Sequence, residues 1–144
     1  MQISEIMCSD VKTIKLGNSL REAAITMVND KIGSIIIVDD DDKPIGVITR
    51  TDILTHFVSK EPIDPNVPVD QYIKSKLISV APDAQSDFAT DLLVKNQLHH
   101  LVVQDSKGKL VGVLSTLDLV DLYCHQNRSF PYFVPKTKKR ELNS

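Results

Sequence analysis

Two hydroxyl–carboxylate pairs have the residue types and the spacing to hold a polar ligand. Thr49 precedes Asp52 by three positions, and Ser115 precedes Asp118 by the same distance. Residues three apart at a helix start lie on the same side of its first turn. An ionised aspartate only accepts hydrogen bonds, which suits a diol with two O–H donors. The hydroxyl can donate to a phosphate oxygen, and a helix N-terminus favours the same anion.

The same spacing also has a purely structural interpretation. Ser or Thr at the N-cap, followed three positions later by an acidic residue, is a common helix start. A single pair of this kind is therefore weak support for a ligand. Its weight depends on the elements around it.

Both pairs belong to an internal repeat. Gly112 follows Gly46 by 66 positions, and the same offset aligns residues 3–54 with residues 69–120 without a gap. Few residues are identical, but the apolar positions coincide almost throughout. An ungapped match of this kind indicates a duplicated structural unit. We therefore expect Gly46 and Gly112 to lie in similar surroundings.

The pattern of apolar and turn residues in each repeat predicts a short apolar turn, a brief strand, a helix, a hairpin of two strands and a last helix. The expected strands are 11–16, 34–38 and 44–49, then 77–80, 100–104 and 110–115. Ser19 and Glu22 form a capping box for the first helix, and the last helices open at Thr49 and Ser115. The apolar helix faces are expected to comprise Leu20, Ala23, Ala24, Met27 and Val28 in the first repeat, and Phe88, Ala89, Leu92 and Leu93 in the second.

Composition and charge limit the classes of protein to which the chain can belong. With 144 residues, 42% hydrophobic and 25% charged, it is typical of a globular protein, and a net charge of −2 argues against nucleic-acid binding by bulk charge. The expected domains are repeat 1 at 1–60, a linker and repeat 2 at 61–125, and an extended or disordered basic tail at 126–144. No apolar run could span a bilayer, and the N-terminus is unlike a signal peptide. We expect a cytoplasmic chain without a membrane partner, in which Cys8 is a small buried side chain.

The repeated hairpin-and-helix pattern resembles the cystathionine β-synthase (CBS) domain, and the tandem is similar to a stand-alone CBS pair, or Bateman module. The resemblance rests on a Gly-h-h-Ser/Thr-x-x-Asp signature at 46–52 and again at 112–118, each after a strand hairpin. It implies an α/β (α+β) fold of two β-α-β-β-α units that pair through their sheets with pseudo-two-fold symmetry. It also implies that adenosyl ligands (AMP, ADP, ATP or S-adenosylmethionine) bind in the clefts between the repeats.

The resemblance assigns roles to further residues. It implies an adenine slot beside Ile14 and Val80, and it places His99 and His100 at positions that face ligand phosphates. Arg50 could reach a phosphate with its fork of donors, whereas the second repeat has Thr116 there, so the two sites are not equivalent. An imidazolium would add positive charge near a phosphate, which favours the site with His99 and His100.

Nothing in the sequence indicates catalysis or a resident metal. HExxH, GxSxG, P-loop and GxGxxG motifs are absent. We therefore interpret the chain as a regulatory protein that is not an enzyme and requires no cofactor. In this interpretation it binds an adenine nucleotide, forms a homodimer and signals to a partner protein. The alternatives are a ligand-free dimeric scaffold that docks a partner through its fold and basic tail, and a small nucleotide hydrolase that uses His99 or His100.

Overall fold

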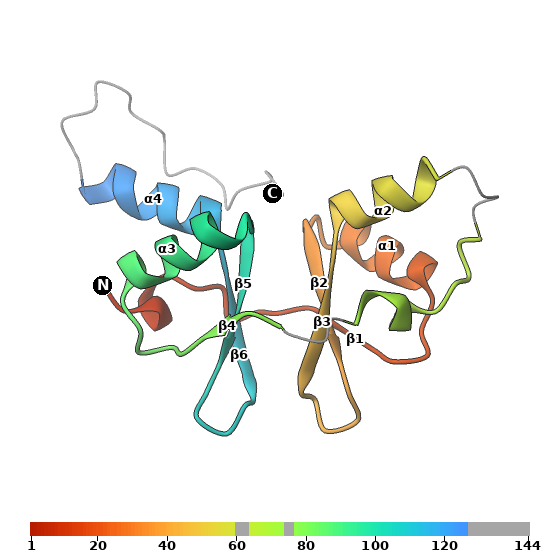
Figure 1. Cartoon of the computed structure of the whole chain (residues 1–144), viewed down its shortest axis with the longest axis horizontal. Helices are drawn as coiled ribbons and strands as arrows, with labels where there is room; N and C mark the ends of the chain where they lie inside the picture. The colour runs from red at the N-terminus through yellow and green to blue at the C-terminus, as the bar shows by residue number, and fades with distance from the viewer. Residues whose placement is uncertain (60–63, 74–76, 127–144) are drawn as a thin grey trace. The chain divides into compact units, whose positions relative to one another are not determined.

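The computed structural model describes residues 1–59, 64–73 and 77–126. Its elements repeat in the predicted order (Figure 1): η1 (Ile3–Glu5), β1 (Thr13–Lys15), α1 (Leu20–Asn29), β2 (Ser34–Val38), β3 (Pro44–Thr49) and α2 (Arg50–Phe57), then η2 (Val69–Tyr72), β4 (Ser79–Val80), α3 (Ser86–Asn96), β5 (His100–Gln104), β6 (Leu110–Ser115) and α4 (Thr116–Gln126). The predicted mixed α/β fold is confirmed, and β2, β3, β5 and β6 have the predicted bounds. Gln126 ends α4, and residues 127–144 of the predicted tail lie outside the described residues.

Each repeat contributes one three-stranded sheet. The strand orders are β1-β2-β3 and β4-β5-β6, with the first pair parallel and the second antiparallel in both. Both hairpins carry an irregularity near the end of their first strand, at Ile37/Val38 and Val103/Gln104. The two sheets therefore share their register irregularities as well as their order, as expected of a duplicated unit.

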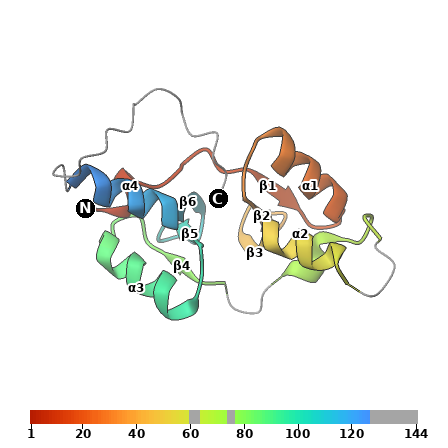
Figure 2. The ribbon, with the colours of Figure 1, turned by 90° about the horizontal axis from the view of Figure 1, so that it is seen from above.

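Each sheet supports its own hydrophobic core beneath two helices. In Figure 1, α1 and α2 lie on the same side of the first sheet, and Figure 2 shows α3 and α4 side by side. The cores consist mainly of β-branched strand residues and small or flexible helix residues: Ile14, Leu20, Ala23, Met27, Ile35, Ile37, Ile48 and Val69 in one, and Ile3, Val80, Ala89, Leu93, Leu101, Val103 and Leu114 in the other.

Two residues expected on the apolar helix faces were assigned wrongly. Val28 is 75% exposed and Phe88 is 54% exposed, whereas Leu20, Ala23, Met27, Ala89 and Leu93 are buried as predicted. At about 100° per residue, both exposed side chains lie at or beyond the edge of the buried stripe of their helix. The buried faces are therefore narrower than the apolar pattern.

Local hydrogen bonds define where α1 begins. The Ser19 hydroxyl accepts a hydrogen bond from the Glu22 amide at 3.2 Å, and the Ser19 amide donates to Glu22 Oε2 at 2.8 Å. This reciprocal pair satisfies amides that the first turn of a helix cannot bond internally. The predicted capping box is confirmed.

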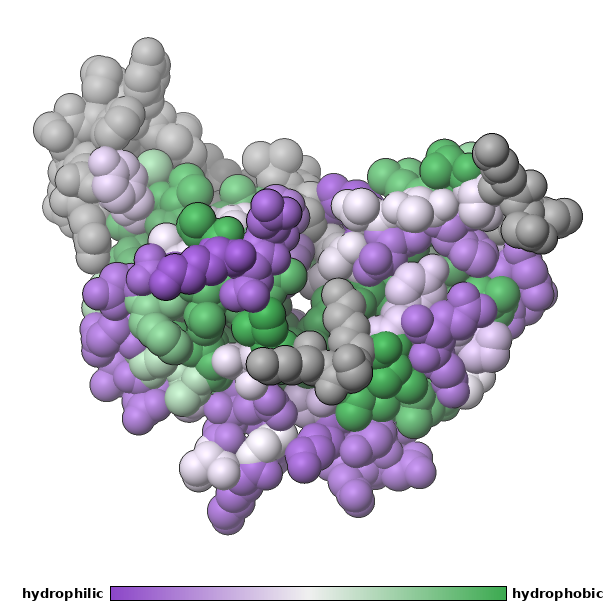
Figure 3. Space-filling view, viewed as in Figure 1, coloured by the Kyte–Doolittle hydropathy of each residue, from purple (hydrophilic) through white to green (hydrophobic). Residues whose placement is uncertain are grey.

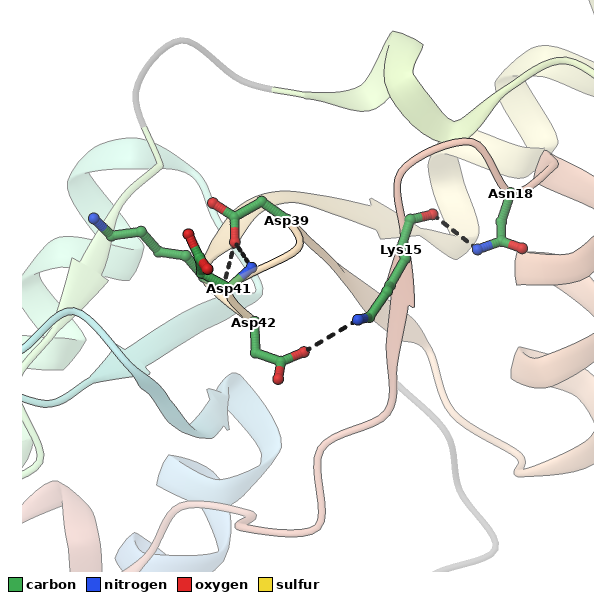
Figure 4. A network of polar contacts seen from close by, with 6 residues as sticks. Lys15, Asn18, Asp39, Asp41 and Asp42 are labelled. Atoms are coloured by element: carbon green, nitrogen blue, oxygen red, sulfur yellow. Dashed lines mark hydrogen bonds and ion pairs between the residues drawn. The ribbon is translucent and has the colours of Figure 1, made fainter.

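An aspartate closes each hairpin. Asp39 Oδ1 accepts hydrogen bonds from the amides of Asp41 and Lys43, each at 2.9 Å (Figure 4). Asp105 makes the same two bonds in the second hairpin. In each hairpin the carboxylate bonds amides of its own turn, in the manner of an Asx-turn.

The leading segment of each repeat, residues 1–8 and 67–73, packs on the core formed by the other repeat. Residues 1–10 form a compact unit with residues 78–126, which we name the β4–β6 unit. The described residues from 11 to 77 form the β1–β3 unit. Ile3 donates its amide to the Ala84 carbonyl at 2.9 Å, and Val69 donates to the Asn18 carbonyl at 2.8 Å. Both side chains are fully buried.

The repeats at 1–60 and 61–125 are therefore repeats of the sequence. Each compact unit of the structure instead combines the leading segment of one repeat with the remainder of the other.

Cys8 lies at the end of its leading segment and is exposed, so the expectation that it is buried is wrong. Its backbone, by contrast, pairs with Val113 through two hydrogen bonds of 2.9 Å. The segment is held by its main chain at this point, which leaves the thiol outside the core.

Replacing Ile3 by Ala is expected to destabilise the β4–β6 unit, although Ile3 belongs to the first repeat. Truncating a buried isoleucine to alanine costs about 2–5 kcal/mol. Denaturant unfolding measures the loss, and amide hydrogen exchange should accelerate most in β5 and β6. The matched control is Ile25→Ala, at a side chain on α1 that is 47% exposed, with a much smaller effect. Acceleration confined to β2 and β3 would contradict the exchange of leading segments.

Candidate functional site

The first hydroxyl–carboxylate pair forms the N-terminus of α2. The Thr49 amide donates to Asp52 Oδ2 at 2.7 Å, and the Thr49 hydroxyl donates to the same oxygen at 2.9 Å. The Asp52 amide donates to Thr49 Oγ1 at 3.2 Å, and the Arg50 amide donates to the Gly33 carbonyl at 3.0 Å. The pair is thus a capping box that uses aspartate in place of the usual glutamate.

The second pair repeats this geometry at the start of α4. The Ser115 amide and hydroxyl donate to Asp118 Oδ2 at 2.7 and 2.9 Å, and the Asp118 amide donates to Ser115 Oγ at 3.3 Å. The Thr116 amide donates to the His99 carbonyl at 2.9 Å. Both pairs are partly buried, so these bonds are only partly open to competition from water.

The two oxygens of each carboxylate have different roles. Oδ2 accepts two hydrogen bonds within the capping box, whereas Oδ1 of Asp52 and Asp118 accepts none from the described residues. Because the capping bonds fix the side chain, the remaining oxygen is a pre-oriented acceptor. The carboxylate can therefore hold an O–H donor without giving up its role in the helix.

The donors expected for a phosphate are partly committed. The proton of the Thr49 hydroxyl is directed to Asp52 Oδ2, and the amides of Arg50 and Asp52 are bonded. The sequence could not show this, because the same hydroxyl can either donate to a ligand or complete the capping box. A lone pair of the hydroxyl oxygen remains as an acceptor.

The glycine of each signature lies against a leading segment. A Cβ atom on Gly46 would stand 2.6 Å from the Tyr72 carbonyl oxygen, and one on Gly112 would meet the Met7 side chain and stand 3.0 Å from the Cys8 carbonyl oxygen. Gly46 also pairs with Ile73 as an antiparallel bridge. The prediction that both glycines lie in similar surroundings is confirmed.

Tyr72 lies near Asp52 and was missed from the sequence. Burial raises the pKa of the Tyr72 phenol above its usual 10.0, and the negative charge of Asp52 raises this pKa further. The repeat aligns Tyr72 with Ile6, an apolar position, which indicated a core residue and nothing more. Both side chains do pack on a core, but only Tyr72 carries a hydroxyl, and the charge of Asp52 acts on it.

The other residues predicted for the site lie in different environments, some in the cores and some on the surface. Ile14 and Val80 are core side chains, 8% and 5% exposed. Arg50 and His99 are exposed, and His100 is half-buried opposite Ser115 in the register of β5 and β6. The structure therefore brings together Thr49 with Asp52 and Ser115 with Asp118. His99 and His100 lie at the beginning of β5, next to the second pair.

Comparison with known protein families identifies the same domain in each of the two repeats. The profile of the CBS domain matches residues 3–59 and again residues 69–125. The chain belongs to the CBS domain family. An uncharacterized 17.7 kDa protein of Acidianus ambivalens is 31% identical to this CBS pair over 118 residues, which cover 82% of the chain and 70% of that protein. The chain spans 62% and 42% of the next two relatives, so it matches only part of their length.

Solved CBS pairs share the fold. The CBS domain pair of protein MJ0100, in complex with 5′-methylthioadenosine and S-adenosyl-L-methionine, has a TM-score of 0.79 at 21% identity and covers 88% of this chain and 98% of its own. A CBS domain protein from Pyrobaculum aerophilum complexed with AMP has a TM-score of 0.76 at 23% identity, with 85% and 98% covered. At these identities the likeness establishes the fold of the two repeats.

In the described part of the CBS pair, no helix combines the length and the apolar character that crossing a bilayer requires.

Replacing Asp52 by Asn is expected to lower the pKa of Tyr72 while leaving it above 10.0. The substitution removes the negative charge that disfavours tyrosinate, and burial, the larger cause, stays. Because the pKa is raised in the folded state, this group's contribution to stability is present below about pH 10 and is lost at higher pH. Absorbance titration of tyrosinate measures the shift, and Tyr72→Phe assigns it. An unchanged titration in Asp52→Asn would contradict the proximity of the two groups.

Proposed function

We propose that this CBS pair is a regulatory protein, not an enzyme, that binds an adenosine-containing nucleotide at its hydroxyl–carboxylate pairs and signals to a partner. AMP, ADP, ATP and S-adenosylmethionine are the candidate ligands. The observation that carries the proposal is Oδ1 of Asp52 and of Asp118, which accepts no hydrogen bond from the residues that the structure describes. A ribose offers neighbouring O–H donors of the kind that an acceptor-only carboxylate can bind.

The ligands of related folds support an adenosine compound. The protein MJ0100 pair is in complex with 5′-methylthioadenosine and S-adenosyl-L-methionine, and the Pyrobaculum aerophilum protein is complexed with AMP. All three compounds contain adenosine and differ in the group attached to the ribose. Recognition through the ribose is consistent with that common part.

The charged groups near the two pairs differ. The first has Arg50 directly after Thr49, and the second has Thr116 there, with His99 and His100 at the start of β5. The first pair therefore has one cationic side chain nearby, whereas two imidazole rings can contribute donors beside the second. We propose that the Asp118 site with His99 and His100 is the one that holds a phosphorylated ligand when a single site is filled.

One observation favours the scaffold alternative. Both hydroxyl–carboxylate pairs are complete capping boxes, so helix capping alone accounts for the presence of all four residues. A ligand-free scaffold that docks a partner would need nothing more from them. Ligand binding by the purified chain separates the two functions.

Titration calorimetry with AMP, ADP, ATP and S-adenosylmethionine is expected to detect binding by at least one of them. Asp118→Asn should weaken it by about tenfold or more if the Asp118 site is filled, because a hydrogen bond to a charged group contributes about 1.5–3 kcal/mol. Asparagine keeps an oxygen for the capping box, so the helix start is preserved. Asp52→Asn reports on the other site in the same way.

Glu22→Gln is the matched control for both substitutions. It neutralises the acidic member of the capping box of α1, outside either site, and should leave ligand affinity unchanged. Equal weakening by Glu22→Gln would attribute the loss to helix capping. Absence of binding by all four compounds at millimolar concentration would overturn the nucleotide proposal in favour of the scaffold.

We also propose that the chain forms a homodimer through its helices. Val28, Leu54 and Phe57 are each more than half exposed, and so are their equivalents Val94, Val120 and Tyr123. Apolar surface over α2 is visible in Figure 3. An exposed apolar set that recurs at the same positions in both repeats suits a symmetric partner, and a second copy of the chain is one.

Sedimentation is expected to give about twice the monomer mass of 16.1 kDa. Phe57→Glu combined with Tyr123→Glu should shift the chain toward monomer, because burying a carboxylate in an apolar interface is costly. Thr55→Glu is the control, since Thr55 is an exposed polar residue of the same helix. A monomeric wild type would contradict the dimer without affecting ligand binding.

A further inference from the structure

The two carboxylate sites differ at one residue supplied by the leading segments. Tyr72 stands at the repeat position of Ile6. Tyr72 packs against the core of the β1–β3 unit, and Ile6 packs against the core of the β4–β6 unit. Each side chain therefore reaches its unit from the other repeat, and only one of them carries a polar group.

The backbone around Tyr72 is tightly held. Its carbonyl oxygen lies against Gly46, where no Cβ could be accommodated, and Ile73 pairs with Gly46 across the strand edge. Gly46 lies in β3, three residues before Thr49, where α2 begins. Tyr72 and Ile53, the residue after Asp52, also pack against the same core. These contacts hold the Tyr72 backbone against β3, the strand that leads into α2, and place its side chain on the core that Ile53 also contacts.

The phenol and the carboxylate both have hydrogen-bonding capacity left. Among the described residues, the Tyr72 hydroxyl makes no hydrogen bond, and Asp52 Oδ1 accepts none. The two side chains are close enough for the Asp52 charge to act on the phenol. One is a donor and the other an acceptor, so a ligand hydroxyl can donate to Oδ1 while its oxygen accepts from the phenol. Partial burial makes such a bond stronger than in water.

We propose that Tyr72 is a specificity-determining residue of the Asp52 site, where its hydroxyl donates to the ribose hydroxyl that Asp52 binds. This inference rests on the proposed binding of adenosine compounds. At the Asp118 site the equivalent side chain is Ile6, which offers apolar contact and no donor. The Asp52 site therefore discriminates more strongly than the Asp118 site against a ligand that lacks ribose hydroxyls, because the missing hydroxyl leaves two polar groups unpaired.

Calorimetry with AMP and 2′,3′-dideoxy-AMP tests this difference on the full chain. Asp118→Asn isolates the Asp52 site, and Asp52→Asn isolates the Asp118 site. The preference for AMP over the dideoxy analogue is expected to be larger in Asp118→Asn. Adding Tyr72→Phe to that variant should reduce the preference by about three- to tenfold, the effect of losing one hydrogen bond of ordinary strength.

Two controls keep the outcome interpretable. Tyr72→Phe keeps the ring and its packing, and thermal unfolding checks that the fold is retained. Thr90→Val removes an exposed side-chain hydroxyl from α3, outside either site, and should change neither affinity. An AMP preference in Asp118→Asn that Tyr72→Phe leaves unchanged overturns this inference alone, and so does a complete loss of AMP binding in Asp118→Asn while the wild type still binds AMP. A wild-type chain that binds no adenosine compound overturns it together with the proposed function.

Discussion

The close approach of a leading segment to the glycine of the third strand is the constraint on which each unit depends. At Gly46 there is no room for a side chain beside the Tyr72 carbonyl, and Gly112 lies against the Met7 side chain and the Cys8 carbonyl. The segments held there deliver Val69 and Ile3, both fully buried, to the two cores. A unit built from one repeat alone would lack this part of its core. The family's glycine is thus explained by packing between two chain segments that are far apart in sequence.

The rest of the signature combines a structural role with a chemical one. The hydroxyl and the aspartate cap a helix, and capping engages only one carboxylate oxygen. The helix start therefore orients a second carboxylate oxygen that capping leaves available as an acceptor. Preorganisation of this kind lowers the entropic cost of binding, because the side chain is already fixed before a ligand arrives. The structural and ligand-binding interpretations of the motif are in this sense compatible.

The two repeats have the same backbone elements and strand pairing, whereas the side chains around the two carboxylates differ. Arg50 stands against Thr116, Ser34 against His100, and Tyr72 against Ile6. A duplicated scaffold with diverged surroundings can hold different ligands, or the same ligand with different affinity, in two geometrically equivalent places. A ligand can shift the conformation of such a pair only by its differential affinity for the two arrangements. Under the proposed function, unequal sites give the pair more than one way to respond to a ligand.

Much of this could be predicted from the sequence, because it depends on local interactions. The 66-residue offset, the capping boxes at Ser19 and Thr49 and the bounds of both hairpins follow from short-range patterns of apolar and capping residues. The tertiary structure alone decided which core each leading segment joins, since Ile3 and Val69 have the same apolar pattern whichever repeat they cover. It also decided that Val28 and Phe88 are exposed, and that Tyr72 lies near enough to Asp52 to feel its charge. These outcomes depend on contacts between segments that are distant in the chain, and local patterns of residues do not specify such contacts.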